Sequence, residues 1–328
     1  MYSLAFRYST PGPGPATLRA VLRFAARRIA GIVLVLLVAV VLTFIAVQFV
    51  PGDPILILLG DQSGDAVLEA RLRAEYGLDR PLVEQFASYV GGVVRGDFGL
   101  SFRYASMPVR DVIATGLAIS PVLALGALAI AVPLGIGLGT FAARRKGTMA
   151  DSLAMLLLVL GISIPNFALA AILVYVAAVR LAVLPVAGWG SPAQAILPLV
   201  VLVIPPTVYV GRLTRTYMLE ILQEDYIRTA RAKGLRERLV IYRHALRNAL
   251  VPLSTSIGII FGGLLSGTFV VETIFNIPGL GSLGIQSIFA RDYPVVMAIV
   301  LLYTFLYSVI NLGVDLLYGF LDPRIRLS

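Results

Sequence analysis

Residues 219–252 read LEILQEDYIRTARAKGLRERLVIYRHALRNALVP, and the rest of the chain is arranged around them. They form the one long polar stretch in the C-terminal two thirds of the sequence, and apolar runs flank them on both sides. Apolar side chains recur every three or four residues before Gly234 and again after it, which is typical of amphipathic helices. A glycine between two such patterns can end the first helix and turn the chain. We therefore expect two short helices that form an elbow on the cytoplasmic side of a membrane protein.

The composition indicates a membrane protein with several spans. The chain has 328 residues, of which 58% are hydrophobic and 14% charged, and its mean hydropathy is +0.89, whereas a soluble domain has about 25% charged residues. The net charge of +9 lies at the ends of apolar runs rather than in a separate soluble domain, so we expect no nucleic-acid partner. The absence of cysteine excludes disulfides and thiolate metal sites. The single histidine, His244, lies in the elbow and predicts no metal site.

Six apolar runs predict six transmembrane helices, of which the fourth is expected to be short and broken by prolines. Residues 51–116 predict a partly helical extracytoplasmic segment after the first helix, with a structural packing role or a surface for a partner. The positive-inside rule places both termini in the cytoplasm, because 19 Lys and Arg then lie inside and 8 outside. The expected order is a tail at 1–28, the first span at 29–50, the outer segment at 51–116, a core at 117–318 that contains the loop 217–250, and a tail at 319–328. The later spans are expected at 117–141, 153–179, 195–211, 251–271 and 293–318.

The elbow allows two interpretations. A basic amphipathic elbow can rest on anionic lipid headgroups. Four of its six central residues 229–234 are small, however, and small side chains suit the close docking of another protein better than insertion into lipid.

The segments DYIRTARAKGL and RHALRNALVP closely resemble the "EAA" cytoplasmic loop of bacterial ABC-importer permeases, in the dipeptide and oligopeptide branch. Arg228, Thr229 and Ala230 stand where the general family has Glu-Ala-Ala, and Gly234 matches the family's glycine. The glutamate is therefore missing from this chain. The resemblance extends to PGDP at 51–54, the run 76–101, SIPNF at 163–167, ETIFNIPGLG at 272–281 and LDPRIR at 321–326.

This resemblance implies the all-α fold of a type I ABC-importer permease in a bacterial inner membrane. It also implies three kinds of partner besides the lipid bilayer: a second homologous permease, two ATP-binding subunits that hold ATP and Mg²⁺, and an extracytoplasmic substrate-binding protein. The loop would dock into a groove on an ATPase subunit, and Pro252 would fix the angle at which the chain leaves the elbow. The implied coupling residues are Asp225, Tyr226, Ile227, Arg228, Thr229, Ala230, Arg231, Ala232, Lys233, Gly234 and Leu235.

The sequence contains no catalytic or nucleotide-binding motif of its own. An ATP-binding loop needs Gly-Lys-Ser/Thr, and neither Lys146 nor Lys233 is preceded by glycine. The chain is therefore not expected to be an enzyme or to bind a cofactor. The interiors of the predicted spans lack ionisable residues, which ion-driven carriers usually need. Energy for uphill transport would have to enter from outside the membrane, although a gated channel and a scaffold that docks a cytoplasmic protein remain alternatives.

Two further groups of residues are candidates for a transport path. Prolines free backbone carbonyls in the third and fourth spans, which can kink a helix for packing or line a cavity; the polar candidates there are Ser163, Asn166, Thr207 and Tyr209. The Gly/Pro-rich run 272–281 predicts an outer gate or re-entrant turn, in which Glu272 and Asn276 satisfy freed backbone groups. Two GxxxG patterns in the fifth span permit internal packing or contact with a partner permease. The implied solute is a di- or oligopeptide, with nickel chelates, glutathione or oligosaccharides as alternatives.

Overall fold

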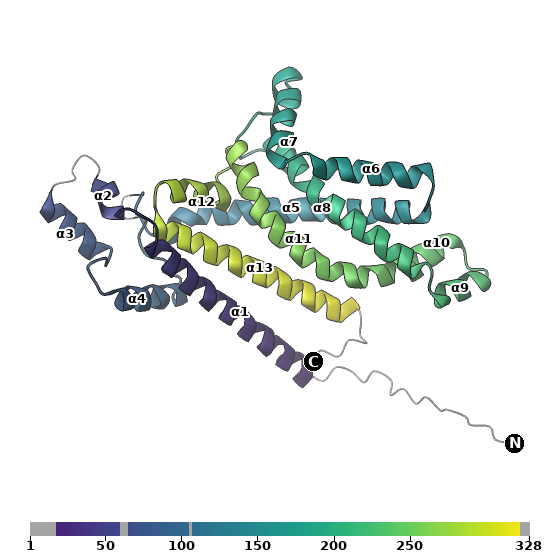
Figure 1. Cartoon of the computed structure of the whole chain (residues 1–328), viewed down its shortest axis with the longest axis horizontal. Coiled ribbons are helices and arrows are strands. Elements are labelled where there is room, and N and C mark those ends of the chain that lie inside the picture. Colours follow the sequence, from purple (N-terminus) through teal and green to yellow (C-terminus); the bar gives the residue numbers. More distant parts are fainter. Residues whose placement is uncertain (1–17, 60–64, 105–106, 322–328) are drawn as a thin grey trace.

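The computed structural model describes residues 18–59, 65–104 and 107–321, and it is built of helices. Figure 1 shows the long helices running side by side along the longest axis of the molecule. The long helices are α1 (Leu18–Gln48), α5 (Val109–Arg144), α8 (Pro192–Ile221), α11 (Leu246–Ile274) and α13 (Tyr293–Leu321). The shorter helices are α2 (Pro54–Leu59), α3 (Ala66–Glu75), α4 (Leu82–Val94), α6 (Met149–Ser163), α7 (Asn166–Leu173), α9 (Asp225–Ala232), α10 (Glu237–Leu239) and α12 (Leu280–Phe289), with π-helical turns η2 (Val174–Arg180) and η3 (Val240–Ala245).

Five helices in the described part of the chain are long and apolar enough to cross a membrane, and the protein is an all-α, multi-pass membrane protein. The third predicted span, 153–179, is divided into α6 and the pair α7–η2, which are bent by 94° relative to each other. The bend lies at Pro165, because the residue before a proline avoids helical geometry and Ile164 is extended (φ −92°, ψ 118°). Counted as one span, this bent pair makes the sixth.

The prediction that the fourth span is short and broken was wrong. α8 is a continuous helix of 30 residues that includes Pro198, Pro205 and Pro206. Proline removes a helical hydrogen bond and usually kinks a helix, but neighbouring helices and hydroxyl side chains can compensate within a membrane bundle. Here Pro198 and Pro206 are buried, and the Thr207 hydroxyl donates to the Val203 carbonyl at 2.7 Å.

The core of the bundle forms where α8 packs against α5 and α11. Glycines on α5 allow the backbones of α5 and α8 to approach closely. A Cβ atom added at Gly139 would lie 2.4 Å from the carbonyl oxygen of Gly211, and one at Gly135 would lie 2.7 Å from Cβ of Val210. The resulting contact fixes α8 at the centre of the molecule.

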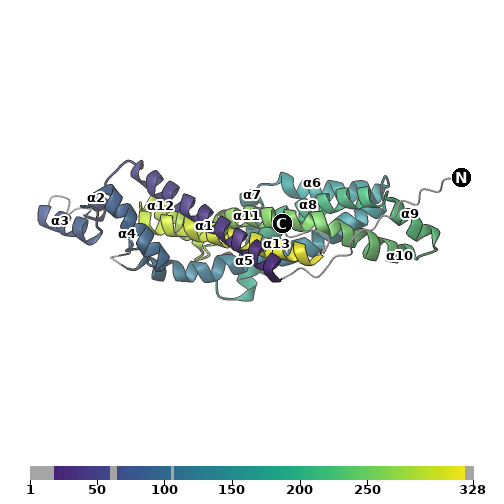
Figure 2. The same cartoon turned by 90° about the horizontal axis from the view of Figure 1, so that it is seen from below.

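The outer segment and the elbow lie at opposite ends of the molecule. Figures 1 and 2 show α2, α3 and α4 at one end of the longest axis and α9 and α10 at the other. α1 begins and α13 ends on the same side, and the two helices pack along each other. This arrangement is the one expected if the outer segment and the elbow face opposite sides of a membrane.

Several helix ends differ from the predicted ones. α1 begins at Leu18, inside the predicted tail 1–28. The two expected elbow helices are also divided differently. The apolar pattern before Gly234 is divided between two helices, the end of α8 at Ile221 and the whole of α9. Glu224 separates them because its backbone is extended (φ −66°, ψ 147°). The pattern after Gly234 runs through α10 and η3 directly into α11, so Pro252 lies inside α11 rather than at the start of a span.

Candidate functional site

Helix α9 is held against the rest of the chain by its two buried side chains. Ile227 is fully buried and Ala230 is nearly so. Both belong to a cluster that draws on the ends of α5, α8 and α11 as well as on η3, and its other buried members are Ala143, Met218, Val240, Ile241, Ala245 and Ala249. Because this cluster joins α9 to four other elements, the elbow is anchored to the bundle. Two of the predicted coupling residues, Ile227 and Ala230, therefore face the chain itself.

The turn at Gly234 closes as the sequence pattern predicts. Gly234 has a φ of +74°, a left-handed conformation that glycine adopts without strain. Its amide donates to the Arg231 carbonyl at 2.9 Å, and the Leu235 amide donates to the Ala230 carbonyl at 3.3 Å. These two bonds form a Schellman motif, which ends α9.

An ion pair closes the elbow across this turn. Arg231 contacts both carboxylate oxygens of Glu237, with Nη2–Oε1 at 2.8 Å and Nε–Oε2 at 3.2 Å. The hydrogen bonds from Arg231 lower the pKa of Glu237, and the same bonds raise the pKa of Arg231. Both side chains stay substantially exposed, so the pair sets the shape of the turn more than its stability.

The outward surface of the elbow is basic and exposed to solvent. A Cβ atom added at Gly234 would have no atom within 4 Å, so that position opens to solvent. Tyr226 is fixed there by a hydrogen bond from the Asn248 amide at 3.1 Å. The exposed residues of the predicted coupling set are Asp225, Tyr226, Arg228, Thr229, Arg231, Ala232, Lys233, Gly234 and Leu235. A rigid, solvent-facing surface of this kind is suited to receive another protein.

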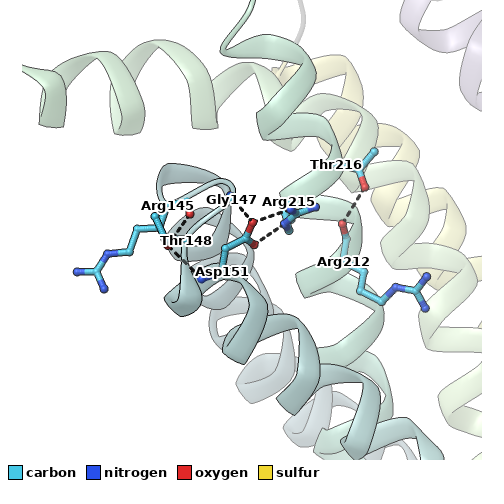
Figure 3. Close-up of polar contacts among 7 residues, drawn as sticks. All are labelled: Arg145, Gly147, Thr148, Asp151, Arg212, Arg215 and Thr216. Atoms are coloured by element: carbon cyan, nitrogen blue, oxygen red, sulfur yellow. Dashed lines mark hydrogen bonds and ion pairs between the residues drawn. The ribbon is translucent and has the colours of Figure 1, made fainter.

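A partly buried ion pair lies near the elbow and was not predicted from the sequence. Figure 3 shows Asp151, in the first turn of α6, pointing toward Arg215 near the end of α8. The pair is bidentate, with Nε–Oδ1 and Nη2–Oδ2 both at 2.8 Å, and the Gly147 amide also donates to Oδ2 at 3.0 Å. Thr148 caps α6 and accepts from the Asp151 amide at 3.4 Å. The T-x-x-D capping pattern at 148–151 could have indicated the start of the helix, but no local signal indicates the partner 64 residues away.

A groove of about 330 Å³ lies beside the bend between α6 and α7. It brings together Asn166 and Tyr209 of the four predicted path residues, beside Pro205 and Pro206. Ser163 is exposed but outside this groove, and its hydroxyl donates to the Val159 carbonyl. Thr207 is buried and bonded within α8 and toward α5, which places it in the packing of the bundle.

The two GxxxG patterns of α11 have different surroundings. Gly258 and Gly262 lie against α13, where an added Cβ would be 2.3 Å from Asn311 Oδ1 and 2.5 Å from the Tyr307 ring. This first pattern serves packing within the chain. Gly263 and Gly267 instead line the groove, and an added Cβ at either would have no atom within 4 Å.

At the other end of α11, the carboxylate of Glu272 binds the start of α12. Glu272 is fully buried. It accepts hydrogen bonds from the Ser120 hydroxyl at 2.6 Å and from the amides of Gly281 and Ser282 at 2.8 and 3.0 Å. The prediction that Glu272 satisfies free backbone groups is confirmed. Asn276 is exposed in the turn with a φ of +48°.

Comparison with protein families agrees with this architecture. The family described as "Binding-protein-dependent transport system inner membrane component" matches residues 135–327, and the N-terminal domain of such membrane components matches residues 21–111. The first match covers more than half of the chain. The chain belongs to the family of binding-protein-dependent transport system inner membrane components. Members of this family are membrane permeases rather than enzymes.

Relatives of this permease chain are similar over almost their whole length. The chain is 42% identical over 306 residues to the dipeptide transport system permease protein DppB of Bacillus subtilis (strain 168), which covers 93% of this chain and 98% of the relative. It is 41% identical over 305 residues to the glutathione transport system permease protein GsiC of Escherichia coli (strain K12), and this match covers 93% of this chain and 99% of the relative. A chain of the MetNI methionine ABC transporter in an inward-facing conformation has the same fold, with a TM-score of 0.52 and 20% identity over 65% of this chain and 96% of that one.

Proposed function

We propose that this chain is the permease subunit of an ATP-driven importer and forms half of a transmembrane path for di- or oligopeptides. The observation that carries the proposal is the elbow: a basic, exposed surface that is anchored to the ends of α5, α8 and α11. A segment anchored in this way can pass a push from outside the membrane into the bundle. The similarity to dipeptide and glutathione permeases supports a peptide-like solute.

The proposed assembly contains a second homologous permease, two ATP-binding subunits and an extracytoplasmic substrate-binding protein. ATP and Mg²⁺ belong to the ATP-binding subunits, since this chain has no Gly-Lys-Ser/Thr loop. The exposed elbow residues around Gly234 would enter a groove on an ATP-binding subunit. The permease would lie in the bacterial inner membrane with both termini in the cytoplasm, an orientation supported by the Lys and Arg distribution.

The proposed mechanism is alternating access. Closure of the ATP-binding subunits on nucleotide would move the two elbows of the assembly, and the helix bundles would switch from inward to outward access. In this chain the groove with Asn166 and Tyr209 would form part of the path. Its lining is mostly apolar with few polar groups, which suits solutes of variable side chain. Glu272 and Asn276 lie at the outer end of α11 and would bound the path as an outer gate.

Reconstitution tests the proposal directly. The complex of both permeases and the ATP-binding subunits would be placed in liposomes with the binding protein, and uptake of labelled dialanine would be measured with ATP and Mg²⁺. Uptake should require ATP and should vanish when the ATP-binding subunits are omitted. Uptake by this chain alone would instead support the channel or carrier alternative.

Glutathione is the second candidate solute, because the identity to the glutathione permease is almost the same as to the dipeptide permease. The same liposomes would be tested with labelled glutathione and with a labelled nickel chelate. Uptake of glutathione without dialanine uptake would assign the chain to that solute while leaving the importer architecture unchanged.

A further inference from the structure

The ion pair between Asp151 and Arg215 joins two helices that the proposed mechanism has to move together. The pair is well shielded from solvent, with 6% of the Asp151 side chain and 26% of the Arg215 side chain exposed. Two parallel hydrogen bonds between a guanidinium and a carboxylate fix both distance and orientation, which a single contact does not. The Gly147 amide holds the carboxylate from the other side. Figure 3 shows that the Arg145 and Arg212 guanidinium groups point away from Asp151.

Helix α6 is attached to the bundle along one narrow stripe. Only Asp151, Ala154 and Leu158 are buried on it, among the residues of α6 that the structure describes. Leu158 packs on Gly211, and Gly161 packs near Ile204. These apolar contacts carry no directional bond between α6 and α8. The bidentate ion pair is the directional contact that fixes the register of the two helices.

The two helices lead to the two ends of the proposed coupling route. α8 ends at Ile221 and is followed within a few residues by α9, the first helix of the elbow. α6 leads to the 94° bend at Pro165, where Ile162 and Asn166 line the groove. A displacement of the elbow therefore reaches the end of α8 first and has to pass into α6 before it can move the bend.

We propose that Asp151 and Arg215 are a positioning pair that transmits movement of the elbow from α8 into α6 and thus to the groove. This inference rests on the proposed function. Neither residue lines the groove. Without the pair, α8 would still move with the elbow, but α6 would slip, and the groove would no longer respond to nucleotide.

The chain contains no cysteine, so single cysteine reporters can be placed without background from this chain, and the labelled band of this subunit is the one measured. Ile162→Cys reports on the groove end of α6, where the native side chain is 51% exposed, and Tyr242→Cys reports on η3 beside the elbow, where it is 49% exposed. Each reporter would be placed in the full complex in liposomes. The maleimide labelling rate would be compared between the nucleotide-free complex and the complex trapped with ATP and vanadate. Both reporters should change their labelling rate on trapping.

The test adds Asp151→Asn, or Arg215→Gln, to each reporter. The expected result is that the complex still assembles, that the response at position 242 persists and that the response at position 162 is lost. Arg212→Gln is the matched control for Arg215→Gln. It removes the same positive charge, but from an exposed side chain that lies one turn away on α8. It should leave both responses in place. If the pair served stability alone, the change in labelling rate on trapping would become smaller at both positions together, and this result would overturn the inference.

Three other outcomes are distinguishable. A full response at position 162 in Asp151→Asn or Arg215→Gln overturns the inference. If neither variant assembles, Arg215→Lys keeps the charge but not the bidentate fork; loss of the response at position 162 then supports the inference, and an undiminished response overturns it. If neither reporter responds in the unaltered complex, the proposed function fails, and the inference fails with it.

Discussion

Replacement of Glu272 by alanine should destabilise the protein strongly, because one carboxylate holds the start of α12. The residue before α12, Gly279, has no side chain with which to cap the helix. Glu272 instead accepts from the amides of Gly281 and Ser282, and it accepts from Ser120, whose hydroxyl oxygen in turn accepts from the Leu280 amide at 2.8 Å. The first-turn amides of α12 therefore depend on this buried arrangement.

The expected cost follows from these contacts. Glu272→Ala leaves two amides and one hydroxyl without their acceptor, and each unsatisfied buried group costs about 1–3 kcal/mol. Water that enters the space recovers part of this, so a total of about 3–5 kcal/mol is expected. Glu272→Gln keeps an acceptor for both amides, and its NH₂ group can donate to the Ser120 oxygen. The Ser120 hydroxyl, however, loses its acceptor, and the attraction between a charge and the helix N-terminus is lost as well, so a total cost of about 1–3 kcal/mol is expected.

Thermal unfolding of the purified protein in detergent, followed by helical circular dichroism, measures the difference. In a chain of this length about 1 kcal/mol corresponds to roughly 2 °C. Glu272→Ala should therefore lower the melting temperature by roughly 6–10 °C and Glu272→Gln by roughly 2–6 °C. Thr273→Ala is the control, since this neighbour is exposed and bonds only to the Phe269 carbonyl of its own helix. Equal melting temperatures for Glu272→Ala and Thr273→Ala would refute the reasoning.

Three further predictions concern the elbow and the outer segment. The Gly234→Asp variant should fold and insert normally, because no atom lies within 4 Å of an added Cβ and the strain of a left-handed backbone is only about 1–2 kcal/mol. The variant should no longer co-purify with the ATP-binding subunits. Normal co-purification would count against docking at this turn. The hydrogen bonds from Arg231 lower the pKa of Glu237, so the ion pair stabilises the elbow above the unfolded pKa of about 4.3, and this contribution is lost as pH falls through the lower folded pKa. Amide hydrogen exchange of the elbow, corrected for intrinsic rates, should show the free energy of local opening fall by about 1 kcal/mol or less in that pH range. Glu237→Gln should remove this pH dependence. Asp292→Ala should loosen the part of the outer segment around Phe102, because the buried Asp292 carboxylate accepts from the Phe102 amide at 3.0 Å. The amide hydrogen of Phe102 should then exchange faster. Unchanged hydrogen exchange at Phe102 would show that other contacts hold the segment.

Features that depend on local chemistry could be predicted from the sequence. The apolar runs gave the positions of the long helices, because an uncharged run of sufficient length has few other stable conformations. Gly234 was expected to end the first elbow helix, and its positive φ confirms this expectation. Glu272 was expected to satisfy backbone groups in a Gly/Pro-rich turn, since such turns leave amides without helical partners.

Features that depend on partners distant in the sequence could not be predicted. The prolines of α8 predict a break when read alone, but burial of Pro198 and Pro206 against neighbouring helices keeps the helix continuous. Asp151 lies just outside the predicted third span and has no local sign of a partner. Its pairing with Arg215 follows only from the antiparallel contact of α6 and α8, which the sequence does not specify.

The continuity of α8 also bears on how a single chain can link its two ends. α8 carries Arg215 near the elbow and Tyr209 at the groove, and it packs on α5, α6 and α11. If α8 were broken at Pro205 and Pro206, as the sequence pattern suggested, a push at the elbow would bend that joint before it moved the groove. In a continuous helix the same push moves Tyr209 directly, while the Asp151–Arg215 pair carries it to Asn166 on the side of the groove formed by α6 and α7. The α8 side and the α6–α7 side of the groove are therefore driven from the same point against the side formed by α11, which is what opening or closing the groove in response to one partner requires.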